Sequence, residues 1–206
     1  MRSSVALCPP GGYAMKSSLT AFTFILLASL VTCPANCQVL RNGSCKVDAE
    51  VFLLPQCALE TRDGHVFVAK EYLPLYFSSG SARLASAVLP EDGWAYFDRH
   101  GLIVVRNVAN FDNGPSPFHY GLVRVNRKSK WGLADSRGTL VVPLTYDGML
   151  EYEESNRGWR VCTGCRWVSA GEYGWFEGGN WYWLDRNGKV AGKAESPISP
   201  GKLGIK

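Results

Sequence analysis

The sequence predicts an all-β protein, built as an array of repeated antiparallel β-hairpins or three-stranded units that stack side by side. The first observation is a motif, Trp-x-x-x-Asp-x-x-Gly, that recurs three times between short apolar strands. The second is its spacing, with tryptophans 37 and 50 residues apart (131 − 94 and 181 − 131), a range typical of repeat architectures. One copy cannot bury its own tryptophan face, so we expect neighbouring copies to pack together.

Residues 1–37 are predicted to be a signal segment. Met15 and Lys16 precede a mostly apolar run over 19–31, and a basic start followed by such a run is typical of a secretory signal. The run is shorter than the roughly 20 apolar residues that a membrane-spanning helix needs. We therefore expect translation to start at Met15 and the protein to be exported, to the periplasm or outside the cell.

The processing of this segment has two interpretations. Cleavage after Cys37 gives a mature protein that starts at Gln38, whereas a rough lipoprotein box would acylate Cys33 and anchor the chain to the membrane. The soluble form is favoured, because Thr32 and Pro34 fit a lipoprotein box poorly.

Four cysteines remain beyond the signal segment, and an even number in an exported chain predicts disulfides. Four cysteines allow three connectivities, of which local pairing is the simplest; they are Cys45, Cys57, Cys162 and Cys165. The formal charge of +4 is too small and too dispersed to indicate nucleic-acid binding.

Residues 38–80 form an N-terminal β region in this interpretation. Strand-like runs at 58–61 and 65–69 flank Arg62-Asp63-Gly64, and Asp-Gly between such runs is a strong hairpin signal. A degenerate copy of the repeat is one interpretation of this hairpin.

Residues 81–192 hold the three clear copies. Each contributes a strand-anchoring tryptophan, an aspartate that bonds the backbone ahead of it, and a glycine that accepts a left-handed conformation. These repeat anchors are Trp94, Asp98 and Gly101; Trp131, Asp135 and Gly138; and Trp181, Asp185 and Gly188. A further strand is expected before each tryptophan. The tail, 193–206, lacks periodicity and is rich in Pro, Ser, Gly and Lys, so we expect it to be disordered.

The second copy, Lys130-Trp-Gly-x-x-Asp-x-x-Gly-x-x-Val-x-Pro-x-x-Tyr-Asp147, resembles the WG (KWG) repeat of bacterial proteins. The other two copies keep the tryptophan, aspartate and glycine but lack the Pro-x-x-Tyr-Asp ending. The resemblance covers about residues 80–192. It implies a β-rich repeat region of bacterial origin, and it supplies no catalytic residues.

The third copy carries an insertion at about 162–180 with two notable features. Cys162-Thr-Gly-Cys165 indicates either a local structural disulfide, which we favour, or a redox-active pair. The rest of the insertion is expected to be a loop that acts as the recognition element, because aromatic and acidic side chains suit contacts with proteins or sugars. These candidates are Glu172, Tyr173, Trp175 and Phe176. The opposing interpretation is that Trp175 folds back onto the repeats, and Trp159 and Trp167 are assigned to the core.

No catalytic constellation is found, and no cofactor or metal is expected: hydrolase, metalloprotease and phosphate-binding motifs are lacking. The three repeat aspartates are explained by their turns. The favoured function is therefore a non-catalytic binding module in the bacterial envelope, with a protein or an envelope component as its partner. Alternatives are a periplasmic immunity or inhibitor protein against a secreted toxin, a cell-wall or carbohydrate-binding module, and an envelope thiol-redox protein.

Overall fold

The computed structural model describes residues 39–40, 45–47, 52–54, 56–61, 63–78, 80, 82–90, 92–112, 114–170 and 173–197. Within these ranges the chain is mostly β-strand, and the strands pair in antiparallel sheets. The predicted all-β class is confirmed. The predicted signal segment, the lipidation site at Cys33, and residues 198–206 lie outside the described residues.

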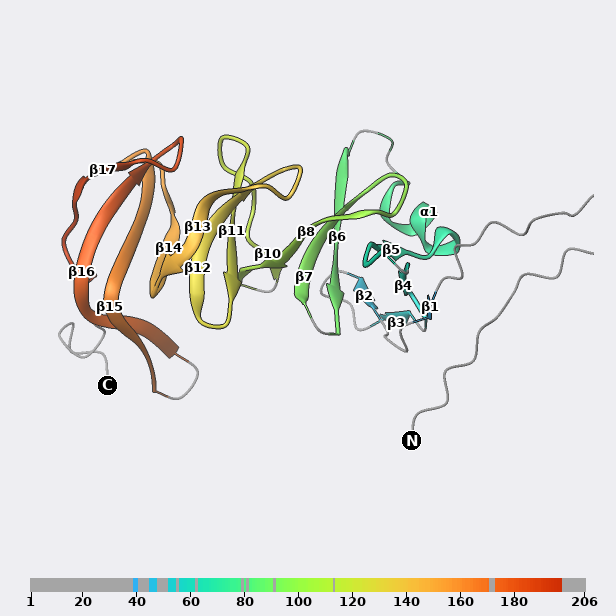
Figure 1. Cartoon of the computed structure of the whole chain (residues 1–206), viewed down its shortest axis with the longest axis horizontal. Coiled ribbons are helices and arrows are strands. Elements are labelled where there is room, and N and C mark those ends of the chain that lie inside the picture. Colours follow the sequence, from blue (N-terminus) through green and yellow to red (C-terminus); the bar gives the residue numbers. More distant parts are fainter. Residues whose placement is uncertain are drawn as a thin grey trace, which may run out of the picture.

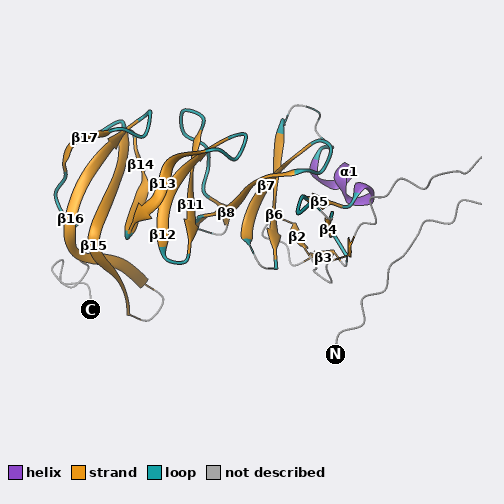
Figure 2. Cartoon of the chain, viewed as in Figure 1, coloured by secondary structure: helices purple, strands orange, loops and turns teal. Residues whose placement is uncertain are grey.

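The elements follow one another along the long axis of the molecule in nearly the order of the chain (Figure 1). At one end lie short strands beside the described helices, which are a 3₁₀ turn at Lys70–Tyr72 and α1 at Leu73–Tyr76 (Figure 2). The short strands are β1 (Val39–Leu40), β2 (Cys45–Val47), β3 (Phe52–Leu54), β4 (Ala58–Glu60) and β5 (Val66–Val68). No described helix has the length and apolar character needed to cross a membrane.

Three antiparallel three-stranded units follow. Unit A is β6 (Leu84–Leu89), β7 (Gly93–Asp98) and β8 (Ile103–Val108). Unit B is β11 (Leu122–Arg127), β12 (Lys130–Asp135) and β13 (Leu140–Tyr146). Unit C is β15 (Gly158–Ala170), β16 (Tyr173–Asp185) and β17 (Val190–Lys193). Short strands β9 (Asn110–Phe111) and β10 (Gly114–Pro115) connect A to B, and β14 (Gly148–Glu153) connects B to C.

Two larger sheets contain these units. One has the order β13-β12-β11-β8-β7-β6-β2-β3, and the other has the order β14-β15-β16-β17. Within the first sheet, β8 and β11 meet at only one residue pair, Val108 with Val125. Units A and B therefore diverge on either side of a narrow join.

The turn between the second and third strands is the same in all three units. In unit A, Asp98 Oδ1 accepts hydrogen bonds from the backbone N–H groups of His100 and Leu102, both at 2.9 Å, and Gly101 has φ +84°. Asp135 and Asp185 accept the equivalent pairs of bonds, and Gly138 and Gly188 have φ +83° and +78°. An aspartate that satisfies the turn backbone has a structural role.

The strand register after this turn is also shared. The residue before each aspartate pairs with the second residue after the glycine: Phe97 with Ile103, Ala134 with Leu140, and Leu184 with Val190. A register shift then follows in each unit, so that the next pairs are Tyr96 with Val105, Leu133 with Val142, and Trp183 with Gly192. A β-bulge at one place in a strand pair is a designed feature that bends the strand.

The N-terminal hairpin β4–β5 has the same backbone bonds around a different residue. The N–H of Thr61 donates to His65 O (2.8 Å), and the N–H of Gly64 donates to Thr61 O (3.0 Å). Gly64 has φ +83°. Thr61, and not Asp63, thus holds the place that aspartate takes in units A to C. β1 completes this small sheet by pairing with β4.

Each turn glycine from unit A onward packs against the last strand of the preceding group. A Cβ atom on Gly101 would lie 2.5 Å from the Val68 carbonyl oxygen in β5, and one on Gly138 would overlap the Val104 carbonyl oxygen in β8. A Cβ on Gly188 would lie 2.6 Å from Val142 Cγ2 in β13. Only a residue without a side chain allows this approach.

The core between the N-terminal strands and unit A contains the first disulfide, Cys45–Cys57, with Cα atoms 5.6 Å apart. The rings of Tyr76 and Phe77, near the short helix, pack edge-on against buried Phe97 at 4.8 and 5.7 Å. The second disulfide joins Cys162 and Cys165 (Cα atoms 5.9 Å apart). The simplest predicted connectivity is therefore confirmed.

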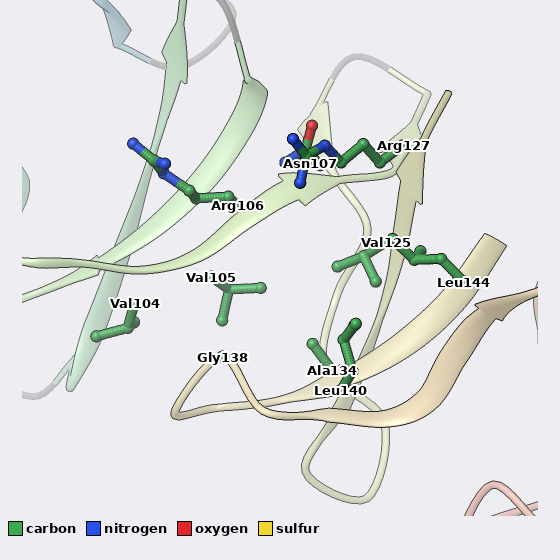
Figure 3. A pocket seen from close by; sticks show the side chains of 10 residues that line it. All are labelled: Val104, Val105, Arg106, Asn107, Val125, Arg127, Ala134, Gly138, Leu140 and Leu144. Carbon is green, nitrogen blue, oxygen red and sulfur yellow. The ribbon is translucent and has the colours of Figure 1, made fainter. Parts of the chain in front are cut away.

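A cavity of about 230 Å³ lies at the junction of units A and B, where β8 leaves β11 (Figure 3). Its lining is mostly aliphatic, with polar side chains from the ends of β8 and β11. The lining residues are Val104, Val105, Arg106, Asn107, Val125, Arg127, Ala134, Gly138, Leu140 and Leu144.

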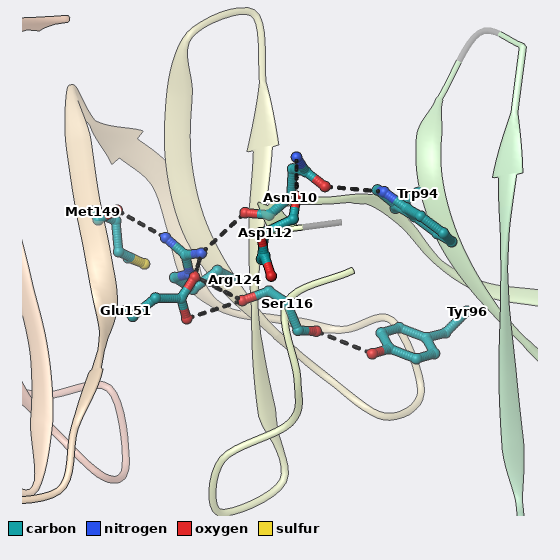
Figure 4. Close-up of polar contacts among 8 residues, drawn as sticks. All are labelled: Trp94, Tyr96, Asn110, Asp112, Ser116, Arg124, Met149 and Glu151. Atoms are coloured by element: carbon teal, nitrogen blue, oxygen red, sulfur yellow. Dashed lines mark hydrogen bonds and ion pairs between the residues drawn. The ribbon is translucent and has the colours of Figure 1, made fainter. Parts of the chain in front are cut away.

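Buried Arg124 of β11 joins the β9–β10 connection to β14 through polar contacts (Figure 4). Its guanidinium forms an ion pair with Glu151 and donates to Ser116 Oγ (3.0 Å) and to Met149 O (3.0 Å). A third donation reaches Asn110 O (3.3 Å). Burial lowers the pKa of the Arg124 guanidinium to about 10, so the side chain still carries its charge at neutral pH.

The β9–β10 connection is also bonded to two side chains of unit A. Trp94 Nε1 donates to Asn110 Oδ1 (3.1 Å), and Tyr96 Oη donates to Ser116 O (3.0 Å). The β9–β10 connection is thereby bonded to unit A on one side and to Arg124 on the other.

The predicted disordered tail begins too early. Lys193 belongs to β17, and the N–H of Ala194 donates to Trp181 O (2.9 Å). Ala194 also packs against the cluster that contains the second disulfide. These contacts fix the chain past residue 193.

Candidate functional site

The long hairpin β15–β16 sets unit C apart from units A and B. Its strands contain 13 residues each, and their pairing continues from Thr163 with Asn180 to Ala170 with Tyr173. The expected loop at 162–180 is therefore wrong: the inserted residues lengthen two paired strands. Glu172 lies outside the described residues, and for Tyr173 only the strand position is described.

One face of this hairpin carries a row of aromatic rings. Trp167 and Phe176 lie directly opposite each other across the strands, with ring centroids 4.9 Å apart. Phe176 continues the row toward Trp131 (5.8 Å) and Trp181 (6.4 Å). Phe176 is 5 % exposed whereas Trp167 is 59 % exposed. Phe176, predicted as a binding residue, is thus a core residue, and Trp167, assigned to the core, is the accessible aromatic.

Gly174 explains how the Trp167 ring can lie over the hairpin. A Cβ atom at this position would overlap the six-membered ring of Trp167. The indole therefore covers the bare backbone of β16, one face against protein and the other toward solvent. Indole rings held this way supply a large contact area at low conformational cost.

The opposite face of the hairpin is more polar. Arg166 Nη2 and Glu177 Oε2 form an exposed cross-strand ion pair at 3.0 Å, and Val168 lies opposite Trp175. Trp175 is half-buried, and its Nε1 has no hydrogen-bond partner within the described ranges. This partial burial agrees with the interpretation in which Trp175 folds back onto the protein.

The second disulfide lies where the hairpin leaves the regular part of unit C. Pairing passes from Thr163–Asn180 to Cys165–Gly178, so Gly164 and Gly179 fall between two regular pairs. Both have positive φ, +72° and +73°, a conformation that glycine adopts readily. The disulfide therefore bridges an irregular step at the base of the hairpin, as expected for a structural role.

β14 packs against this base through Gly148. A Cβ atom there would lie 2.6 Å from Cys162 Sγ and 2.7 Å from Phe176 Cδ1. The disulfide and the aromatic row are thus held by a strand outside the hairpin, which positions Trp167.

Asp147 links unit B to the same base. One carboxylate oxygen contacts Lys130 Nζ at 2.5 Å, and the other accepts the N–H of Gly164 at 2.7 Å. The Asp147 N–H donates to Cys162 O at 2.9 Å. The bond from Lys130, followed by that from Gly164, lowers the pKa of the Asp147 carboxyl below its ordinary value.

We expect Asp147→Asn to weaken this link in a pH-dependent way. Because the folded-state pKa lies below the unfolded one, the carboxylate contributes stability above about pH 4, and this contribution is lost as pH falls through the folded-state pKa. The pair is partly exposed, with side chains 48 % and 29 % accessible, so the loss at pH 7 should be below about 1 kcal/mol. Urea unfolding at pH 7 and pH 3 measures it.

A double-mutant cycle supplies the control. Lys130→Met should lose a similar free energy of unfolding at pH 7, and the double variant little more than either alone. If the two losses simply add, or if the Asp147→Asn loss persists unchanged at pH 3, the proposed link is wrong.

The remaining titratable side chains do not assemble into a catalytic or metal site. Among the residues with described positions, no group of three or more His, Cys, Asp and Glu side chains is placed to hold a metal. His119 stacks on Tyr152 (4.7 Å) and lies 4.0 Å from Glu154, far along the chain from His65 and His100. The strongest candidate site is the exposed aromatic surface of the β15–β16 hairpin.

No protein-family model, curated protein or solved structure matches the chain.

Proposed function

We propose that this chain is an exported WG-repeat protein of a bacterium that acts as a binding module in the cell envelope and catalyses no reaction of its own. The basic start and apolar run before residue 32 support export. The observation that carries the binding role is the β15–β16 hairpin, which presents an exposed indole on a braced base.

A repeat array of four units is part of this proposal. Units A, B and C share the aspartate turn, the register shift and the packing of the turn glycine on the preceding strand. The β1-β4-β5 sheet is the degenerate first unit, with Thr61 at the aspartate position. Repeat units of this kind stabilise each other mainly through nearest neighbours.

The partner we favour is another protein, and a narrower version is a secreted toxin neutralised in the periplasm. Tryptophan is among the residues most often found as anchors of protein interfaces, and Trp167 is 59 % exposed. A cell-wall glycan is the second candidate, and the exposed face of Trp167 specifically favours it, because an indole face suits contact with a sugar ring.

We expect Trp167→Ala to lose the partner while keeping the fold. The ring is 59 % exposed, so the melting temperature should change little, whereas an interface anchor of about 2 kcal/mol or more would weaken binding at least about 30-fold. Capture of envelope proteins by the oxidised mature protein, quantified against wild type, measures the loss. Binding to purified peptidoglycan, measured in parallel, separates glycan from protein recognition.

Val190→Ala is the matched control, because Val190 is equally exposed (60 %) in the same unit but lies on β17 and not on the hairpin. It should bind like wild type. If Trp167→Ala retains the full set of captured partners and full peptidoglycan binding, the hairpin is not the recognition element.

A further inference from the structure

We propose that the cavity between units A and B is a binding site for a small aliphatic carboxylate. This site is separate from the β15–β16 hairpin and comprises residues of β8, β11, β12 and β13 (Figure 3). The proposal rests on the origin of the cavity, on its apolar walls and on the charge at one end.

The cavity exists because one junction is packed with smaller side chains than the other. Ala134 immediately precedes the turn aspartate of unit B, and Leu184 holds the same place in unit C. On the neighbouring strand, Val123 of β11 pairs with Ala134 in unit B, and Trp159 of β15 pairs with Leu184 in unit C. In unit C, Leu184 and Trp159 are fully buried in a continuous core. At the A–B junction the smaller Ala134 lines the cavity.

The walls of this space are suited to a hydrocarbon chain. Val105, Val125 and Ala134 are buried side chains of the two units, and Leu140, at 47 % exposure, lies at the edge. Exposed aliphatic surface beside an unfilled apolar space is costly in water. A ligand that fills the space removes this surface from solvent.

The polar end of the cavity carries a positive charge. Figure 3 shows Arg127 and Asn107 together at one end, away from Ala134 and Leu140. Arg106 pairs with Asp92 through Nε at 3.1 Å, and its buried Nη2 has no hydrogen-bond partner among the described residues. Arg127 is exposed and forms no ion pair with any described residue. Guanidinium groups bind carboxylates through parallel hydrogen bonds, so the polar end selects a carboxylate head group.

The volume limits the length of the ligand. About 230 Å³ is below the 300–1,000 Å³ or so typical of drug-sized sites. The space therefore suits a short monocarboxylate of about six carbons rather than a long fatty acid. An aliphatic tail would lie against the valine and leucine walls with its carboxylate at Arg127.

Titration with hexanoate tests the proposal, with hexylamine as the matched probe of opposite charge. Chemical-shift changes of the full mature protein report the binding position, and calorimetry reports the affinity. We expect hexanoate to saturate with a Kd below about 1 mM and to shift residues of β8 and β13, and hexylamine to leave them unchanged. Equal responses to both probes would overturn the assignment.

Two variants locate the site. Ala134→Leu introduces the residue that unit C carries at this place, and it should abolish hexanoate binding while raising the melting temperature. Arg127→Gln is exposed and leaves the packing intact, and it should weaken hexanoate binding at least tenfold. If Ala134→Leu does not fold, Arg127→Gln decides alone. Wild-type affinity in folded Ala134→Leu or in Arg127→Gln would refute the site.

Discussion

Replacing Gly138 with alanine is expected to destabilise the protein by about 2–5 kcal/mol. The residue has φ +83°, a conformation that costs an ordinary residue about 1–2 kcal/mol. The added Cβ would also overlap the Val104 carbonyl oxygen, and forced overpacking typically costs about 1–3 kcal/mol. The carbonyl belongs to the backbone of β8, so it cannot rotate away as a side chain would. Urea unfolding of the oxidised protein measures the loss.

Gly64→Ala measures the conformational part of this loss alone, and its difference from Gly138→Ala gives the steric part. Gly64 has the same φ, +83°, but a Cβ atom there would meet nothing within 4 Å. The variant should therefore lose only the conformational contribution, about 1–2 kcal/mol. Equal losses at Gly64 and Gly138 would contradict the docking of the unit B turn on β8.

The second large loss of folding stability is expected when Arg124 is replaced. Arg124→Ala leaves Glu151, Ser116 Oγ and Met149 O without the guanidinium that bonds all three. Breaking a buried ion pair by removing one partner costs about 3–5 kcal/mol, and the 30 % accessibility of the Glu151 side chain places the expected loss at the lower end of this range. The side chain is only 5 % exposed, so water cannot replace it without rearrangement. The change in the free energy of unfolding is the measurement.

Arg160→Ala is the matched control, because Arg160 pairs with Trp183 in unit C as Arg124 pairs with Leu133 in unit B. In its ion pair with Glu153 (2.6 Å) the arginine is more accessible, 23 % exposed against 6 % for Arg124, while the two glutamates are similar at 28 % and 30 %. This pair should contribute no more than about 1 kcal/mol. The double variant Arg124→Met/Glu151→Met should recover much of the Arg124→Ala loss. If Arg124→Ala costs no more than Arg160→Ala, the buried network does not stabilise the contact between the β9–β10 connection and β14.

Local chemistry made part of this fold predictable. An aspartate three residues before a glycine specifies its own turn, and the turns at Asp98, Asp135 and Asp185 have the bonds that this pattern predicts. The helix at 73–76 follows no comparable pattern. It is four residues long and is held by Tyr76 and Phe77 against Phe97, a contact between distant segments that periodicity does not reveal.

The candidate site depended on strand pairing, which the sequence did not disclose. Trp167 and Phe176 are both aromatic, and only their position across two paired strands decides which is buried. The sequence does hold one indication: in a strand over 163–170, Arg166 and Trp167 must lie on opposite faces. Arg124 gave another, as a charged side chain between Val123 and Val125, and such residues are rarely buried without partners.

The way the turn glycines pack determines which substitutions the contacts between neighbouring units tolerate. At Gly101 and Gly138 the receiving group is a backbone carbonyl, of Val68 and Val104, and any residue at those positions would offer the same oxygen. At these two positions the packing therefore does not depend on which side chain the receiving residue carries, whereas at Gly188 the nearest group is a side-chain atom, Val142 Cγ2. The β4–β5 turn has Thr61 in place of aspartate and keeps the same backbone hydrogen bonds, so a change of side chain within the turn is compatible with its geometry as long as the glycine is present.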